Sequence, residues 1–197
     1  MKYAIYSMII VVAMIIIFYM RFEKRSSRSR RLVIIAVMTA LSVLGRFIFA
    51  AIPAFKPIAA IVIISAIWLG PECGFMVGSL SVLISNFYFG QGPWTPFQMI
   101  GFGLIGVLAA WLSKPLKKSN IALSIYGAFA GFAYSCIMDV WTVVWYSSEL
   151  TFELLTAAIV TALPFAVVYA ISNIIFLLVL GKPFGEKLER VINKYGI

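Results

Sequence analysis

Residues 154–180 read LLTAAIVTALPFAVVYAISNIIFLLVL, a stretch without a single charged side chain. An α-helix rises about 1.5 Å per residue and a hydrocarbon core is about 30 Å thick, so this stretch is long enough to span a bilayer. Hydrophobic residues make up 63% of the 197-residue chain, and charged residues only 12%. A soluble domain of this size has too little interior to bury that much apolar surface. The sequence therefore predicts an all-α membrane protein.

Six further apolar segments precede this one in the chain. They lie at about 3–20, 32–50, 57–69, 73–89, 97–113 and 120–145. The segment 57–69 is short for a span, but a re-entrant arm would bring Glu72 to membrane depth, where a charge is costly. We therefore expect it to form a full hairpin with the segment that follows Gly70 and Pro71.

The first apolar segment stands apart from the other six. It has no small-residue cleavage site and is followed by a basic, serine-rich linker, which is typical of a retained membrane anchor. We expect residues 1–30 to form an extra N-terminal transmembrane helix with its linker. Residues 31–197 are then a six-helix membrane core, whose amphipathic, basic tail after Gly181 should lie on the membrane surface.

The distribution of Lys and Arg predicts the orientation. With the N-terminus outside, the inner connections hold 13 basic residues, in the ranges 21–31, 114–118 and 182–194. The outer side holds 3, namely Lys2, Arg46 and Lys56. Such an excess on one side is the positive-inside pattern and places the C-terminus in the cytoplasm. The net charge of +9 therefore indicates membrane orientation, not nucleic-acid binding.

Signatures of enzymes and of metal or cofactor sites are missing from the sequence. The chain has no histidine, and Cys73 and Cys136 lie in separate apolar segments, which favours packing over a metal site. The run 101–106 fits GxGxxG but lies inside an apolar span, so we interpret it as helix packing. Without a phosphate-binding loop, any ATP-driven step needs another chain. We expect no catalytic residue, metal or cofactor.

The connection between the fourth and fifth segments carries the most specific chemistry. Residues 86–98 read NFYFGQGPWTPFQ. Glycines permit close approach to a ligand, prolines stiffen the loop, and amides and hydroxyls give directional hydrogen bonds. An interfacial aromatic belt explains Trp and Tyr but not the Gly-Pro framework. We therefore predict ligand contacts, with an aromatic or macrocyclic small molecule, from Asn86, Tyr88, Gln91, Trp94, Thr95 and Gln98.

Charged residues near the outer ends offer two interpretations. Asp139 contacts a ligand, or it forms a structural pair with Arg46 or Lys56, and both hold if the pair opens on binding. For Arg46, snorkelling to the interface is favoured over ligand contact. Lys56 is a better ligand candidate, because Pro57 restricts its backbone.

Three further patterns concern helix faces. Trp141 and Trp145 share a face, either as pocket lining or as an aromatic belt. Asn173 suits an interhelical hydrogen bond, and Gly127 with Gly131 suits close helix packing.

The chain resembles a known family, the substrate-specific S components of energy-coupling factor (ECF) vitamin transporters. The resemblance covers about residues 31–197 and rests on Ala36-Val37-Met38-Thr39-Ala40, on Phe55-Lys56-Pro57-Ile58-Ala59-Ala60, and on the stretch FGQGPWTPFQ at 89–98. It implies a six-helix fold that binds a vitamin from outside. It also implies docking, through the face of Ala36 and Ala40, on a membrane-spanning T subunit driven by two cytosolic ATPases. The stretch 89–98 further resembles S components for cobalamin.

Other interpretations stay open at this stage. The chain could carry another vitamin or precursor, such as riboflavin. A membrane-embedded lipid enzyme would need a cluster of charged residues at one depth, whereas Asp139 stands alone within the apolar segments. A structural or assembly protein would have no ligand at all.

Overall fold

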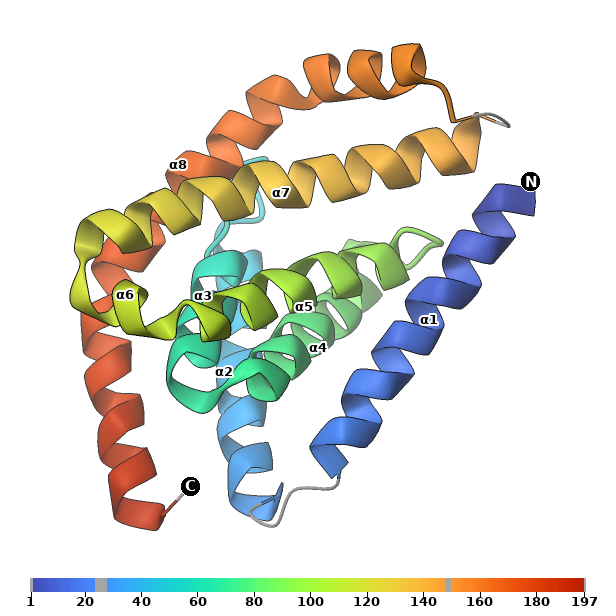
Figure 1. The fold of residues 1–197 in the computed structure, drawn as a ribbon. Helices are drawn as coiled ribbons and strands as arrows, with labels where there is room; N and C mark the ends of the chain where they lie inside the picture. Colours follow the sequence, from blue (N-terminus) through green and yellow to red (C-terminus); the bar gives the residue numbers. More distant parts are fainter. Residues whose placement is uncertain (1, 24–27, 148–149, 197) are drawn as a thin grey trace.

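A computed structural model describes residues 2–23, 28–147 and 150–196, and its regular elements there are all helices (Figure 1). In chain order they are α1 (Lys2–Glu23), α2 (Arg28–Ile48), α3 (Ile58–Leu69), α4 (Pro71–Phe89), α5 (Thr95–Trp111), α6 (Ser113–Lys118), α7 (Asn120–Tyr146) and α8 (Phe152–Tyr195). The predicted all-α fold class is confirmed. The short helix α6 forms where we expected only a connection.

The chain is a multi-pass membrane protein by the length and composition of its helices. Four described helical stretches are long and apolar enough to cross a bilayer, at residues 29–48, 71–89, 120–146 and 152–195. Three shorter apolar helices accompany them, at 5–20, 58–69 and 95–111.

Helix α3 forms the centre of the bundle. Each of its residues except Trp68 is buried, and it contacts α2, α4, α5 and α8. A helix that is apolar all round lies in a protein core or in lipid, and this 12-residue helix is enclosed by its neighbours. Gly70, with a φ of 94°, makes the turn into α4, and Pro71 begins that helix.

Small residues bring the helices together. A Cβ atom built on Gly106 of α5 would lie 2.9 Å from the Gly74 carbonyl carbon of α4, closer than real side-chain contacts. The GxGxxG run therefore packs helices, as predicted. The interhelical hydrogen bond expected of Asn173 and the close packing expected at Gly127 and Gly131 are also confirmed, and both join α7 to α8: Asn173 Nδ2 donates to the Gly127 carbonyl at 3.0 Å, and Gly131 lies against the Ala170 backbone.

The basic tail is part of α8 and not a separate element. This 44-residue helix continues through Pro164 and Pro183 to Tyr195, and Figure 1 shows its last part running past the end of α7. Beyond Gly181, the Trp68 ring of α3 packs against Gly185. This contact with the core anchors the tail, whose location on the membrane surface stays a prediction.

Helix α1 lies against the flank of α4 and α5 (Figure 1). Its Phe18 ring stacks on Phe75 at 4.1 Å between centroids, and the Tyr19 and Ser79 hydroxyls are 3.1 Å apart. The predicted linker falls partly on residues 24–27, outside the described residues. The division of the chain at residue 30 stays a prediction.

Candidate functional site

The ends of α2, α4 and α5 bring together a group of polar side chains, here called the polar cluster. Its members are Arg46, Ser85, Asn86, Gln91, Thr95 and Gln98. Asn86 is its centre: its amide nitrogen donates to Gln98 Oε1 at 2.8 Å and to Thr95 Oγ1 at 3.1 Å. Four of the predicted ligand residues thus share one hydrogen-bonded network.

The connection from α4 to α5 is shaped by the same network. Gly90 ends α4 with a φ of 107°, and the Thr95 hydroxyl donates to Gln91 Oε1 at 2.9 Å. That hydroxyl also accepts from the Gly92 amide at 3.3 Å, while the Gln91 amide donates to the Leu83 carbonyl at 2.9 Å. The loop is therefore held in one shape before any ligand arrives.

Arg46 enters the polar cluster from α2. Its guanidinium donates to the Ser85 hydroxyl and, at 3.2 Å, to Asn86 Oδ1, and it lies 5.0 Å from the centre of the Phe89 ring. We expected snorkelling to the interface, whereas the structure turns this side chain inward. Both hydrogen bonds come from Nη1, which carries two N–H groups and can therefore satisfy two acceptors at once.

Two tyrosines that the sequence analysis missed lie next to Arg46. Tyr134 of α7 and Tyr169 of α8 lie near its guanidinium, and their ring centres are 5.3 Å apart. Tyr134 also interacts with the Gln98 side chain and stacks on Phe102 at 4.2 Å. A phenol deep within an apolar span was the signal that could have pointed to them.

An aromatic group lies beside the polar cluster along α5 and α7. Trp141 is 7% exposed, and its ring centre lies 6.1 Å from Trp94 and 6.4 Å from Phe97. Trp145 stacks on it at 6.3 Å, so both tryptophans join one group. Within the described part of the chain, the buried Trp141 Nε1 has no hydrogen-bond partner. It is a donor that a ligand could use.

Lys56 is anchored by structural contacts. Its ammonium donates to the carbonyls of Phe49 at 3.0 Å and Ile52 at 2.8 Å, just past the end of α2. Its backbone exchanges two hydrogen bonds with the Ser172 hydroxyl of α8. Burial lowers the pKa of the Lys56 ammonium, and the Arg46 guanidinium nearby lowers this pKa further. The two cations therefore make this end of the bundle electropositive.

Asp139 and Tyr88 lie apart from the polar cluster. Asp139 is half-buried on α7 and hydrogen-bonds with the Ser135 side chain, one turn away. Arg46 and Lys56, its proposed partners, make the contacts described above instead. Tyr88 is 74% exposed and packs edge-on against Phe47 at 4.9 Å. Both residues remain predicted ligand contacts that the geometry does not bring into the network.

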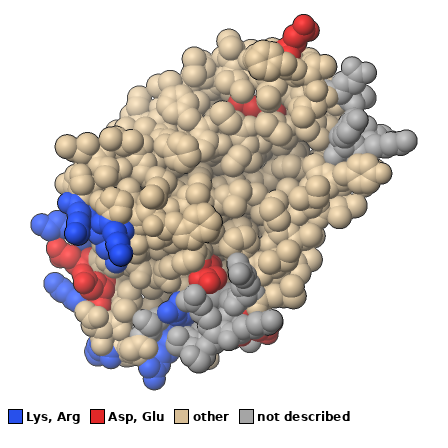
Figure 2. All heavy atoms as spheres, viewed as in Figure 1, with Lys and Arg blue, Asp and Glu red and all other residues tan. Residues whose placement is uncertain are grey.

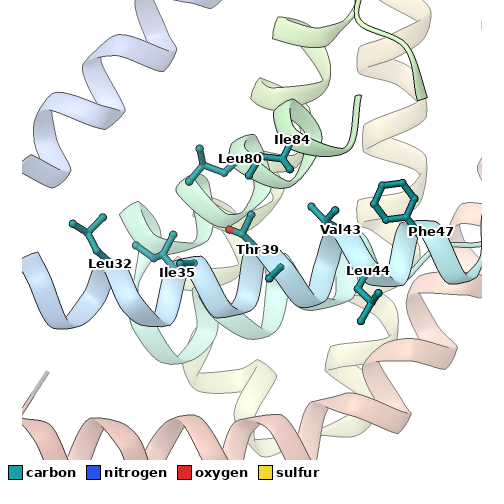
Figure 3. Close-up of a pocket in the computed structure, with 10 residues that line it drawn as sticks. Leu32, Ile35, Thr39, Val43, Leu44, Phe47, Leu80 and Ile84 are labelled. Atoms are coloured by element: carbon teal, nitrogen blue, oxygen red, sulfur yellow. The ribbon is translucent and has the colours of Figure 1, made fainter. Parts of the chain in front are cut away.

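The predicted docking residues border a groove between α2 and α4 (Figure 3). Ala36 and Ala40 are exposed along it, and Leu80 and Ile84 of α4 form the opposite wall. Its volume is about 500 Å³, and its lining is almost entirely apolar. Thr39 lies between the alanines, with a buried hydroxyl that has no partner among the described residues. Small side chains along such a groove allow another helix to approach closely.

The arrangement suits the binding of a small molecule. The described residues contain no group of three His, Cys, Asp or Glu side chains that could hold a metal ion. The polar cluster offers amides, hydroxyls and a guanidinium, the neighbouring Tyr134 and Tyr169 offer phenols, and the aromatic group offers flat surfaces. These are the features of a site that recognises a small molecule by shape and hydrogen bonds.

Comparison with known proteins gives two findings. A family model described as "ECF-type riboflavin transporter, S component" matches residues 26–189. A UPF0397 protein of Aliivibrio salmonicida (strain LFI1238) is 25% identical over 147 residues, which cover 72% of this chain and 77% of that protein. No solved structure matches the chain.

Proposed function

We propose that this chain, which belongs to the family of S components of ECF-type transporters, captures a vitamin at the outer face of the cytoplasmic membrane. Members of this family are substrate-binding subunits and not enzymes. The family match begins at residue 26, which supports regarding α1 as an addition to a six-helix core. The proposed orientation has the N-terminus outside and the C-terminus in the cytoplasm. This orientation rests on the excess of Lys and Arg at 21–31, 114–118 and 182–194, at the end of the bundle opposite the polar cluster.

The polar cluster is the observation that carries this proposal. A buried polar network in a membrane protein is costly unless its members are satisfied, and here Asn86, Thr95 and Gln98 satisfy one another. Such a network holds the ends of α2, α4 and α5 in place relative to one another, as a preformed binding site requires. Arg46 and Lys56 favour electron-rich groups of the ligand, while the free indole N–H of Trp141 offers a further donor.

Riboflavin is the first candidate ligand. The matching family model has riboflavin in its description, and a flat ring system would stack on Trp94 or Trp141. The polar side chains largely bond one another, which favours a ligand that needs only a few free partners. Cobalamin is the second candidate, because the stretch 89–98 resembles S components for that vitamin.

The proposed partners are a membrane-spanning T subunit and two cytosolic ATPases. The groove with Ala36 and Ala40 is the proposed docking face for the T subunit, because its small side chains and exposed apolar lining suit a partner helix. The ATPases would supply the energy for release of the vitamin inside.

The experiment that tests this function is calorimetric titration of the purified chain in detergent with riboflavin, cobalamin and a panel of other vitamins. We expect saturable binding of one vitamin, weakened by Trp94→Ala and by Gln98→Ala. Trp111→Ala is the matched control, because Trp111 is 72% exposed at the opposite end of α5. Binding should stay unchanged in that variant.

Each outcome separates the alternatives. Binding of riboflavin alone or cobalamin alone assigns the substrate, and binding of a third vitamin replaces both candidates. Failure of every vitamin to bind, by the isolated chain and by the chain assembled with its partner subunits, would contradict the capture role. It would favour an assembly protein without a ligand.

A further inference from the structure

A second cavity lies at the opposite end of the bundle from the polar cluster. It has a volume of about 270 Å³ and is formed where α3, α6, α7 and α8 meet. Its lining includes Trp68, Asn120 and four charged side chains, which are Lys117, Lys182, Glu186 and Glu189. None of these residues belongs to the proposed vitamin site.

Trp68 fixes one wall of this cavity. Its ring packs on Gly185 of α8, where a Cβ atom would lie only 2.4 Å from the ring. The Lys117 ammonium of α6 lies 5.1 Å from the centre of the same ring. Tryptophan and lysine at the end of apolar helices mark the level of lipid headgroups. The cavity therefore opens at the depth where a headgroup lies.

The charges of the cavity balance one another. Two lysines and two glutamates line it, and Figure 2 shows positive and negative side chains meeting at the end of the molecule where α6 adjoins α8. An anionic headgroup would meet the lysines but also Glu186 and Glu189. A headgroup with both a phosphate and an ammonium complements all four side chains.

An apolar groove adjoins this cavity at Leu116. Its volume is about 550 Å³, and it is lined by Leu112, Leu116, Ile125, Phe129 and other apolar residues of α5, α6 and α7. Leu116 lines both the cavity and the groove. A charged pocket joined to an apolar groove matches a headgroup joined to an acyl chain.

We propose that this cavity and groove form a binding site for a phospholipid with a zwitterionic headgroup, of the phosphatidylethanolamine class. The phosphate would lie at Lys117 and Lys182, the ammonium at Glu186 and Glu189, and one acyl chain in the groove beside Leu116. The site is independent of the vitamin pocket, so failure of one proposal leaves the other untouched.

The test is native mass spectrometry of the full chain, released from micelles that contain phosphatidylethanolamine and phosphatidylglycerol with identical acyl chains in equal amounts. We expect retained phosphatidylethanolamine to exceed phosphatidylglycerol by about fivefold, since each exposed charge contact contributes up to about 1 kcal/mol. The double variant Lys117→Gln/Lys182→Gln should lose this lipid. Glu186→Gln/Glu189→Gln should reverse the preference toward phosphatidylglycerol.

The matched control is Lys114→Gln/Lys118→Gln. It also removes two charges, from positions on α6, the helix of Lys117, that do not line the cavity. It should retain lipid as the unaltered chain does. Water-soluble glycerophosphoethanolamine should fail to displace the lipid, because it lacks the acyl chain. Equal retention of both lipids by the unaltered chain, or equal losses in the two lysine variants, would show annular lipid only and overturn the proposal.

Discussion

Helix α2 borders both the polar cluster and the groove of Ala36 and Ala40, here called the docking groove. Polar side chains are hydrogen-bonded to one another in the first region and, within the described ranges of the chain, lack partners in the second. In the polar cluster, Arg46 donates to Ser85 and Asn86, and the Ser85 hydroxyl also lies 2.5 Å from the Ser81 carbonyl. Beside the groove, the hydroxyls of Thr39 and Ser42 are buried without a partner among the described residues. The first region is complete within the chain and suits a small ligand. The second exposes small and apolar residues that suit a partner helix.

The strongest test of this contrast is Arg46→Ala. The variant removes the guanidinium, and one charge-assisted hydrogen bond from it to the ligand is worth about 1.5–3 kcal/mol, so vitamin binding should weaken by about 10- to 100-fold. Calorimetry on the purified chain measures it. Arg46→Lys keeps the positive charge but replaces the planar guanidinium with a single ammonium group, and should give an intermediate loss of vitamin affinity. Full affinity in Arg46→Ala would mean that the polar cluster is only structural.

The groove is tested by Ala40→Trp, which places a large side chain on its exposed wall. Overpacking costs about 1–3 kcal/mol, so vitamin uptake by cells that also express the partner subunits should fall roughly tenfold. Vitamin affinity of the purified chain should stay unchanged. If vitamin affinity fell together with uptake, the groove would contribute to vitamin binding and would not be a separate docking surface.

Trp141→Phe examines the unpaired indole in the aromatic group. The ring remains but the N–H is lost, and one hydrogen bond is worth about 1 kcal/mol, so affinity should fall about fivefold if a ligand accepts it. Trp145→Phe, on an exposed ring of the same helix, serves as control. Unchanged affinity in Trp141→Phe would remove this donor from the site.

The smallest effect is expected from Thr39→Val. The change removes a buried hydroxyl that has no partner while keeping the side-chain shape, so the free energy of unfolding should stay within about 1 kcal/mol or rise. Asn86→Leu, in contrast, leaves Gln98 Oε1 without this donor and removes one of the two donors to the Thr95 hydroxyl, so it should lower the melting temperature clearly. Thermal unfolding in detergent compares them. Similar losses in both variants would contradict the contrast between the regions.

Part of the candidate site was predictable because its residues are close in sequence. Asn86, Gln91, Thr95 and Gln98 fall within a single turn and the helix ends beside it, so any compact connection brings them together. Arg46 and Tyr134 come from other helices. Which way these two side chains point is set by the rotation of α2 and α7 about their own axes. That rotation depends on how the two helices pack against α4 and α5, which the sequence does not state.

The same limit explains Lys56 and Asp139. Both are charged residues near the outer helix ends, and sequence alone suggested that they could pair. The fold places the Lys56 ammonium at the carbonyls that follow α2 and turns Asp139 toward Ser135. A carbonyl group at a helix end is invisible in the sequence as a partner, yet it attracts a cation as a carboxylate does.

The sequence by itself determined the helical fold class, the approximate limits of the apolar helices and the family of transport subunits. Hydrophobic runs and turn residues act locally, and a bilayer requires helices of a certain length. Only the tertiary structure decided that α3 is enclosed by its neighbours, that Arg46 points inward and that two lysines and two glutamates line one cavity. These arrangements depend on how whole helices pack, and close packing couples residues that are far apart in the chain.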